Sequence, residues 1–217
     1  MVIGEEQVRW SAPAGERHGR PWLVLLHGHG MDESIGFDLR HRLPPSLVLA
    51  SLRGPLRVRA GYGWFSLDPQ SFDLAQVDAA VEDVLSWLGR QTGYRSLGIL
   101  GFSQGSAIAV ECLRLRPELF ACAVLLSGFL NPLPRPGDPA LASMRPPVFS
   151  GRGDADRLVP GVLTTLTDTW LRGHTRLEHK VYPGLGHNVA PQEIEDLTDF
   201  LRRHLPGLDD DGMTRGR

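Results

Sequence analysis

Short runs of residues that are apolar at every position recur along the chain, and stretches of helical periodicity separate them. Such runs are typical of strands covered on both faces, as in a parallel sheet. Parallel strands need a crossover connection, usually a helix, and the intervening stretches supply it. The pattern predicts an α/β fold with a doubly wound, mostly parallel sheet. The expected strands are 8–10, 22–27, 47–52, 96–102, 122–128, 147–151 and 176–183.

The clearest helix signal covers residues 73–91. Apolar residues recur there at three- and four-residue spacing, Ser71 or Asp73 is available to cap the start, and Gly93 lies just beyond the end. Further helices are expected over 104–115, 160–172 and 190–204.

Two long stretches, 53–72 and 129–146, carry neither pattern. We expect both to be loops, either functional covers or insertions. The 217 residues suit one domain, which we place at 1–207, and the polar segment 208–217 is expected to be a frayed, disordered tail.

Composition excludes several classes of partner. The net charge of −2 gives no electrostatic reason to expect nucleic acid, and no apolar run approaches the roughly 20 residues of a membrane span. We therefore expect no stable membrane anchoring. The first ten residues carry acids where a signal peptide would be basic, so the expected location is cytoplasmic. Cys112 and Cys122 both fall in predicted core segments and are interpreted as reduced structural thiols.

The sequence GFSQG, residues 101–105, lies between a predicted strand and a predicted helix. A Gly-x-Ser-x-Gly sequence in this context is typical of a nucleophile elbow, in which a strained serine projects from the top of the sheet. Gly101 and Gly105 leave room for the close approach of strand and helix. The alternative is a tight turn in which Ser103 only caps the helix.

A serine nucleophile needs a general base, and the base needs an acid that orients it. In this topology the acid and then the histidine follow the serine along the chain. Asp154 and Asp156 lie in the loop after the strand at 147–151, and spacing does not separate them. His187 lies in a glycine-rich loop after the last strand. Three other histidines are interpreted as packed or solvent-facing: His174, His179 and His204.

An acyl-transfer site also needs an oxyanion hole, a pair of N–H donors for the developing negative charge. One expected donor is the backbone N–H of Gln104, which follows the serine. The other is the backbone N–H of His29, in the His-Gly-His-Gly turn after the strand at 22–27. A metal site at His27 and His29 is not supported, because no further ligand cluster has suitable spacing. We expect no metal and no cofactor.

Six motifs in order, over residues 22–200, resemble the phospholipase/carboxylesterase branch of the α/β-hydrolases, which includes bacterial carboxylesterases and acyl-protein thioesterases. The resemblance implies a compact α/β-hydrolase fold without a large cap domain. The motifs are LLHGHG, GWF at 63–65, GFSQGS, LSGFL at 126–130, GDADRLVP at 153–160 and GLGHNV at 184–189.

The resemblance assigns a role to each candidate. It implies that Ser103 is the nucleophile, His187 the base and Asp156 the orienting acid, because the family uses the second aspartate of this loop. The backbone N–H groups of His29 and Gln104 would form the oxyanion hole. The expected activity is hydrolysis of short- to medium-chain carboxylic esters, with lysophospholipids or acyl thioesters as further substrates.

Aromatic and apolar residues of the two long stretches are candidates for substrate binding, and the alternative is that they only pack the loops down. Trp64 matches a tryptophan of the family's substrate-proximal loop. Two other functions stay open: a peptidase or other acyl hydrolase of the same fold, and a catalytically silent binding domain. A small-molecule acyl ester is the expected partner, and the resemblance is compatible with a homodimer. The candidate lining residues are Tyr62, Trp64, Phe65, Leu67 and Phe129.

Overall fold

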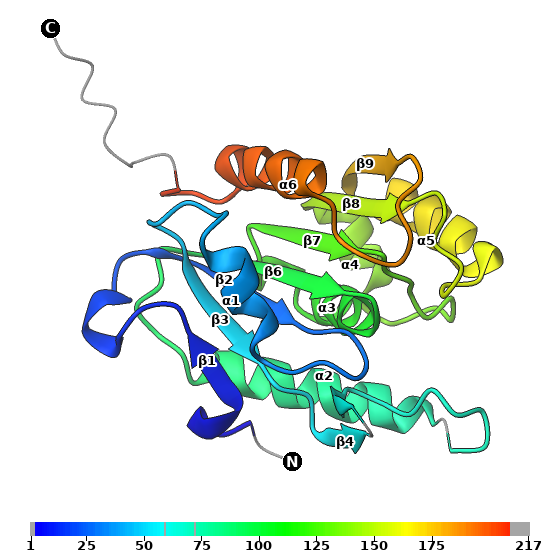
Figure 1. Ribbon diagram of the computed structural model, residues 1–217, viewed down its shortest axis with the longest axis horizontal. Helices are drawn as coiled ribbons and strands as arrows, with labels where there is room; N and C mark the ends of the chain where they lie inside the picture. The colour runs from blue at the N-terminus through cyan, green and yellow to red at the C-terminus, as the bar shows by residue number, and fades with distance from the viewer. Residues whose placement is uncertain (1–2, 59, 72, 209–217) are drawn as a thin grey trace, which may run out of the picture.

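The computed structural model describes residues 3–58, 60–71 and 73–208, without the side chains of residues 36–38. Its main sheet has the order β1-β3-β2-β6-β7-β8-β9 (Figure 1). β1 pairs antiparallel with β3, and every other pair is parallel. The strands of this sheet are β1 (Val8–Trp10), β2 (Pro21–Leu26), β3 (Val48–Leu52), β6 (Ser96–Phe102), β7 (Cys122–Leu126), β8 (Pro147–Gly153) and β9 (Arg176–Tyr182).

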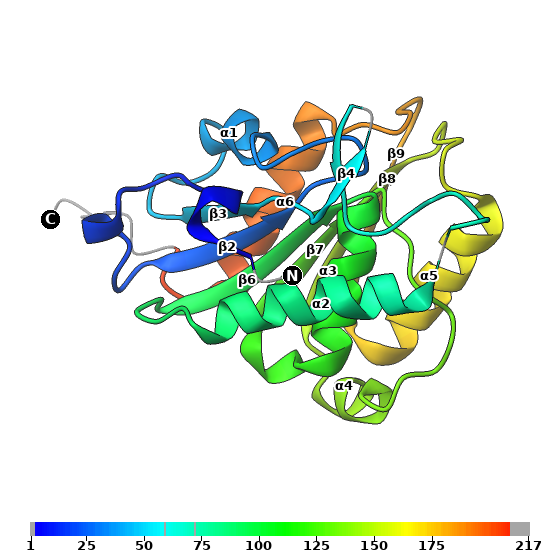
Figure 2. The same ribbon diagram turned by 90° about the horizontal axis from the view of Figure 1, so that it is seen from below.

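Helices cover both faces of the sheet (Figure 2). One face is covered by α1 (Ile35–Arg40) and α6 (Pro191–His204). The opposite face is covered by α2 (Leu74–Gly89), α3 (Gln104–Leu115), α4 (Asp138–Met144) and α5 (Gly161–His174). Three short 3₁₀ helices lie in the connections, at Glu5–Gln7, Ala14–Glu16 and Pro117–Leu119.

The alternation of side chains along β2 explains why its sequence is apolar throughout. Leu23 and Leu25 join the core beneath α1 and α6, whereas Val24 and Leu26 join the core beneath α2 and α3. A strand buried on both faces has no position where a polar side chain reaches water. The continuous apolar runs of the sequence are therefore the direct signature of this two-sided covering.

The predicted doubly wound α/β fold is confirmed, and no large cap domain lies over the sheet in the described part of the chain. The seven predicted strands and the four predicted helices are all present, with ends shifted by at most two residues. The strand expected over 122–128 ends at Leu126, because Ser127 adopts φ 46°. Asp73 caps α2 by accepting a hydrogen bond from Ala75 N at 2.9 Å.

The expectation of two unstructured loops is wrong. Residues 53–72 contain a two-stranded sheet of β4 (Leu56–Val58) and β5 (Gly61–Gly63), and residues 129–146 contain α4. The β4–β5 hairpin is short, so it lacks the long alternation that identifies a strand, and proline masks the start of α4. The short helix α1 was not predicted either.

The far end of the chain is only partly described. Leu208, which the sequence analysis assigns to the tail, is 2% exposed and packs in the core beneath α6. The other tail residues, 209–217, lie outside the described residues. Among the helices of residues 3–208 that are described, none has the length and apolar character needed to cross a membrane.

Candidate active site

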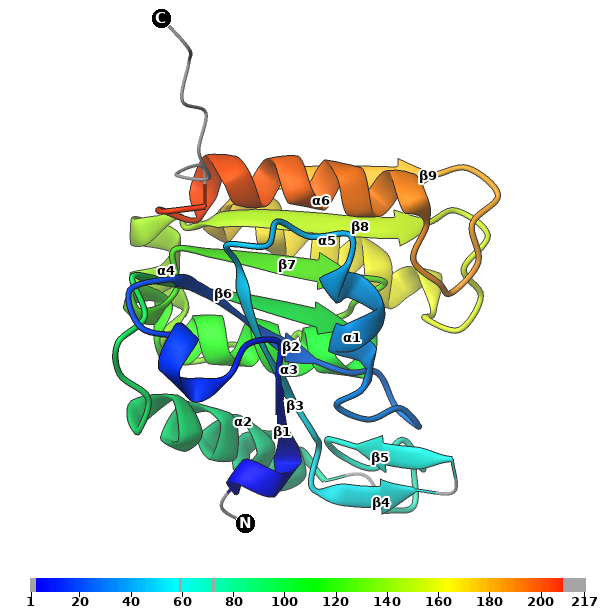
Figure 3. The same ribbon diagram turned by 60° about the vertical axis from the view of Figure 1, so that its left-hand side comes forward.

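The loops that follow β6, β8 and β9 meet at the carboxyl-terminal edge of the sheet (Figure 3). They bring Ser103, Asp156 and His187 into contact. Nε2 of His187 lies 2.8 Å from Oγ of Ser103, and Nδ1 lies 2.7 Å from Oδ2 of Asp156. A carboxylate only accepts hydrogen bonds, so the imidazole proton lies on Nδ1 and Nε2 accepts from the serine hydroxyl. This is the arrangement needed to remove the hydroxyl proton.

Ser103 lies at a strained turn between β6 and α3. Its φ of 53° and ψ of −117° place it in a region that side-chain-bearing residues rarely adopt. The flanking glycines make the turn possible. A Cβ on Gly101 would lie 2.4 Å from the backbone of Gly105, and a Cβ on Gly105 would lie 2.0 Å from the carbonyl oxygen of Leu26. The turn puts Oγ at the N-terminus of α3, where the helix dipole favours negative charge.

The structure separates the two candidate acids. Asp156 bonds to His187 through Oδ2 and accepts a hydrogen bond from Leu158 N at 2.9 Å through Oδ1. Asp154 is exposed and instead accepts from Gly184 N at 2.7 Å. Burial alone would raise the pKa of Asp156, but the hydrogen bonds from His187 and the loop backbone outweigh it and hold that pKa below its usual range. Asp156 is therefore a carboxylate at neutral pH.

The two expected oxyanion donors follow β2 and β6, which are neighbouring parallel strands. Neither the backbone N–H of His29 nor that of Gln104 has a hydrogen-bond acceptor in the described part of the chain. The turn that carries His29 is anchored to β5, because Gly30 N donates to Tyr62 O and Tyr62 N donates to Met31 O, both at 2.8 Å. Free N–H groups on an anchored turn are what a preorganised oxyanion hole requires.

His27 supports the same turn, a role that the sequence analysis missed. Its imidazole is fully buried, with Nδ1 2.7 Å from Gly28 O and Nε2 accepting from Gly54 N at 2.9 Å. Because Nε2 accepts, the proton lies on Nδ1, and burial lowers the pKa of His27. His27 is thus a neutral link between the turn that carries His29 and the segment after β3. Its position directly after a buried strand was the only sequence signal.

The side chain of Gln104 makes a second link that the sequence analysis missed. It is 1% exposed and binds the loop after β5 at two points: Oε1 accepts from Trp64 N at 2.8 Å, and Nε2 donates to Phe65 O at 2.7 Å. Trp64 in turn donates from Nε1 to His27 O at 2.8 Å. The sequence predicted a role only for the backbone N–H of Gln104. In the structure, the buried side-chain amide of Gln104 also fixes the neighbouring loop.

One expectation about substrate contacts needs correction. Trp64 is 2% exposed, packs in the core and uses its indole N–H within the fold, so it is a positioning residue and not a groove wall. Leu67 is 51% exposed. Phe65 and Phe129 do border a cavity of about 300 Å³, here called the α3-side cavity. Its lining residues are Phe65, Leu74, Val77, Ala107, Glu111, Phe129, Leu130, Asn131, Pro132, Leu133 and Leu163.

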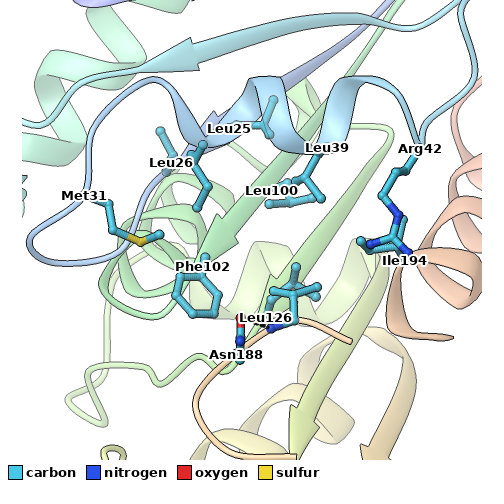
Figure 4. A pocket seen from close by; sticks show the side chains of 12 residues that line it. Leu25, Leu26, Met31, Leu39, Arg42, Leu100, Phe102, Leu126, Asn188 and Ile194 are labelled. Carbon is cyan, nitrogen blue, oxygen red and sulfur yellow. Dashed lines mark hydrogen bonds between the residues drawn. The ribbon is translucent and has the colours of Figure 1, made fainter. Parts of the chain in front are cut away.

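A second cavity, of about 240 Å³, lies on the other face of the sheet, between α1 and α6 (Figure 4). We call it the α1-side cavity. Of the twelve lining residues whose side chains the structure describes, ten are apolar, so the cavity suits a hydrocarbon group. The lining residues are Leu25, Leu26, Met31, Ile35, Leu39, Arg42, Leu100, Phe102, Leu126, Asn188, Val189 and Ile194.

The other histidines of the second half lie outside this constellation. His174 stacks on Trp170 at 4.1 Å between ring centroids, and Nε2 of His179 lies 3.5 Å from Asp168. The ring of His204 packs against Phe200. No group of three or more metal-ligating side chains occurs in the described ranges of the chain. Cys112 and Cys122 are buried and unpaired, as expected of structural thiols.

Comparison with known proteins places this geometry in a family. Residues 12–205 match the sequence model of the phospholipase/carboxylesterase family. The chain is 33% identical to acyl-protein thioesterase 1 of Saccharomyces cerevisiae over 48% of this chain and 48% of that protein, so it spans about half the length of this relative. It is 26% identical to a carboxylesterase of Arabidopsis thaliana over 66% of this chain and 68% of that protein.

Solved structures share the fold over nearly the whole chain. The crystal structure of Zea mays acyl-protein thioesterase 2 superimposes with a TM-score of 0.72 at 22% identity, covering 91% of this chain and 98% of that one. A carboxylesterase from Mesorhizobium loti superimposes with a TM-score of 0.73 at 21% identity, covering 92% of this chain and 97% of that one, and these likenesses confirm the fold class inferred from the motifs.

Proposed function

The chain belongs to the phospholipase/carboxylesterase family and is a hydrolase, and on that premise we propose that it is a serine carboxylesterase. It acts on short- to medium-chain carboxylic esters through Ser103, His187 and Asp156. The observation that carries the proposal is the unbroken chain of hydrogen bonds from Oγ of Ser103 through His187 to Asp156. An acid, a base and a nucleophile in mutual contact at a sheet edge are the requirements for acyl transfer.

In the first half of the reaction, Nε2 of His187 takes the proton of Ser103 as Oγ attacks the ester carbonyl carbon. The carbonyl oxygen becomes an oxyanion, bound by the backbone N–H groups of His29 and Gln104. Collapse of this intermediate breaks the bond to the alcohol oxygen, which takes the proton from Nε2 and leaves as the alcohol. Asp156 stays ionised and stabilises the imidazolium.

In the second half, water replaces the alcohol. His187 removes a proton from water as its oxygen attacks the acyl carbon, and the oxyanion forms again in the same hole. The bond to Oγ of Ser103 then breaks, Oγ takes the proton back from Nε2, and the carboxylic acid leaves. Every proton and electron pair is accounted for by the substrate, water and these side chains.

The acyl chain is assigned to the α3-side cavity. Ala107 lies one helical turn beyond Ser103 on α3, and Phe129 follows the strand neighbouring β6, so this cavity borders the nucleophile. A volume of about 300 Å³ with a mainly apolar lining suits a short or medium acyl chain. Acyl thioesters are the second candidate, because acyl-protein thioesterase 1 of Saccharomyces cerevisiae is among the relatives.

The test combines turnover with active-site labelling. Wild type is assayed on p-nitrophenyl esters of graded acyl length and on the matching thioesters, with a fluorophosphonate probe as an independent readout. We expect turnover that declines beyond medium acyl lengths and labelling that disappears in Ser103→Ala. Ser106→Ala is the matched control, since its Oγ is buried and bonded to Gly101 O at 2.6 Å. Labelling that survives in Ser103→Ala would refute the nucleophile, and a wild type without turnover would favour a peptidase or a silent binding domain.

A further inference from the structure

The α1-side cavity is linked to the imidazole of His187 through the residues of its wall. Phe102, which precedes the nucleophile, lines this cavity, and its ring packs against His187 with 5.2 Å between centroids. Asn188, which follows His187, forms another part of the wall. Met31, at the end of the turn that carries His29, lines the cavity as well (Figure 4). The inner end of the cavity is thus bordered by the sequence neighbours of the proposed base and nucleophile.

The two cavities therefore lie on opposite sides of the triad. The α3-side cavity is bordered by α2, α3 and the segment after β7, whereas the α1-side cavity is bordered by α1, α6 and the segment that carries His187. An ester has two substituents, one on the carbonyl carbon and one on the alcohol oxygen. The oxygen that leaves must receive its proton from Nε2 of His187, so its substituent extends on the His187 side.

The α1-side cavity has a positive charge in its wall. Among the lining residues whose side chains the structure describes, Arg42 is the one that is charged, and it lies across the cavity from Met31 and Phe102 (Figure 4). Arg42 is exposed, and its backbone N–H donates to Leu39 O at 2.9 Å, whereas its guanidinium has no hydrogen bond or ion pair within the described ranges. An apolar cavity whose wall contacts the proposed base at one side and carries a guanidinium at the other is complementary to an apolar group with an anionic end.

We propose that the α1-side cavity binds the alcohol portion of the substrate, and that this portion is an apolar alcohol with a negative charge at its far end. The inference rests on the proposed function, because it needs His187 as the proton donor to the leaving oxygen. It assigns the acyl and alcohol groups to separate cavities, so a substitution that fills one cavity changes selectivity for one substituent only.

The first experiment compares three butyrate esters, those of ethanol, hexanol and 6-hydroxyhexanoate. All three form the same acyl-enzyme, so differences in kcat/KM report acylation and the leaving group. Ile35→Trp fills the cavity from α1. We expect it to lower the preference for the two longer alcohols over ethanol by about tenfold or more, the scale on which a pocket discriminates by size. Leu115→Trp, on the exposed far end of α3, is the matched control.

A second variant that fills the α1-side cavity keeps the proposal testable if Ile35→Trp does not fold. Ile194→Phe narrows the cavity from α6, and either variant that labels with fluorophosphonate reports on the proposal. Leu163→Trp narrows the α3-side cavity and is expected to change the dependence on acyl length instead. The inference is wrong if filling the α1-side cavity slows all three esters by the same factor, or if wild type shows no gain from the longer alcohols.

The anionic end is tested with Arg42→Gln. We expect kcat/KM for the 6-hydroxyhexanoate ester to fall by up to about fivefold relative to the neutral hexyl ester, the scale of an exposed ion pair. Arg202→Gln is the control, since its guanidinium already pairs with Asp199 at 3.2 Å. An equal change in kcat/KM for both esters would refute the anionic end of the alcohol. Hydrolysis of ethyl butyrate by wild type with no effect of either substitution would refute the inference and leave the carboxylesterase proposal standing.

Discussion

Gln104 and Trp64 are joined by a hydrogen bond, in which Oε1 of the buried Gln104 amide accepts from Trp64 N at 2.8 Å. The same amide donates to Phe65 O at 2.7 Å. The residue that supplies one proposed oxyanion donor through its backbone therefore fixes the neighbouring loop through its side chain. Gln104 thus combines a proposed role in oxyanion binding with a role in positioning the loop.

Gln104→Leu is expected to destabilise the fold by about 2–4 kcal/mol, because it leaves a buried N–H and a buried C=O unpaired. A lower kcat should accompany this loss. Gln76→Ala is the matched control: Gln76 makes the same pair of bonds, to Ser66 N and Ser71 O, at a partly exposed site where water replaces them. Chemical denaturation and ester assays measure both effects. Equal destabilisation by the two substitutions would contradict this account.

Asp156→Asn is expected to reduce kcat by about 10⁴-fold, because an amide cannot hold the imidazole in the tautomer that accepts from Ser103. Asp154→Asn should change kcat little, since the asparagine oxygen can still accept from Gly184 N. Steady-state kinetics of the two variants decide between the acids that spacing left open. A loss of kcat in Asp154→Asn but not in Asp156→Asn would make Asp154 the orienting acid.

Gly105→Ala is expected to prevent folding or to cost more than about 4 kcal/mol, because its Cβ would lie 2.0 Å from the carbonyl oxygen of Leu26, which is backbone and cannot move aside. Gly89→Ala, at the end of α2, meets nothing within 4 Å and should stabilise the protein by about 0.5–1 kcal/mol. Thermal unfolding compares them. A normally stable Gly105→Ala would mean that the close approach of β2 and α3 is not required.

Because of the buried His27, we expect the protein to lose stability in weakly acidic solution. Burial lowers its pKa from 6.5 in the fold, so as pH falls below about 6.5 the unfolded chain binds a proton that the folded protein excludes. The free energy of unfolding should therefore fall from pH 7.5 to pH 5.5. His179 and His204 also have lowered pKa values, so the test is the difference from His27→Gln, whose profile should be flatter. Parallel profiles would exclude His27 as a contributor.

At Glu193 we expect the opposite pH dependence of the free energy of unfolding. Burial raises its pKa to about 7, Oε1 has no hydrogen-bond partner among the residues that the structure describes, and Oε2 accepts from Ala190 N at 3.3 Å. The Glu193 carboxyl ionises near pH 4.5 in the unfolded chain and near pH 7 in the folded protein. It therefore lowers the free energy of unfolding progressively as the pH rises across that interval, and by about 3 kcal/mol above it. Glu193→Gln should therefore be more stable than wild type at pH 8 and equal to it near pH 4.5. Urea denaturation at both values checks this, and a gain that does not vary with pH would contradict it.

The candidate triad was predictable from the sequence because each member follows a strand, and parallel strands deliver their carboxyl ends to one edge of a sheet. Asp156 was separated from Asp154 by the family resemblance, and the structure supplies the physical reason, since only Asp156 bonds to His187. The role of Trp64 was misjudged because an aromatic residue in a loop looks the same in sequence whether it lines a groove or fills the core.

The sequence by itself determined the layered α/β architecture, the elbow at Ser103 and the order of the proposed catalytic residues, because these depend on local periodicity and on glycines next to a single serine. Only the tertiary structure decided the links made by His27 and Gln104 and the separation of the two cavities. Those features depend on side chains from segments far apart in the chain, whose contact is fixed by packing and leaves no periodic signal along the sequence.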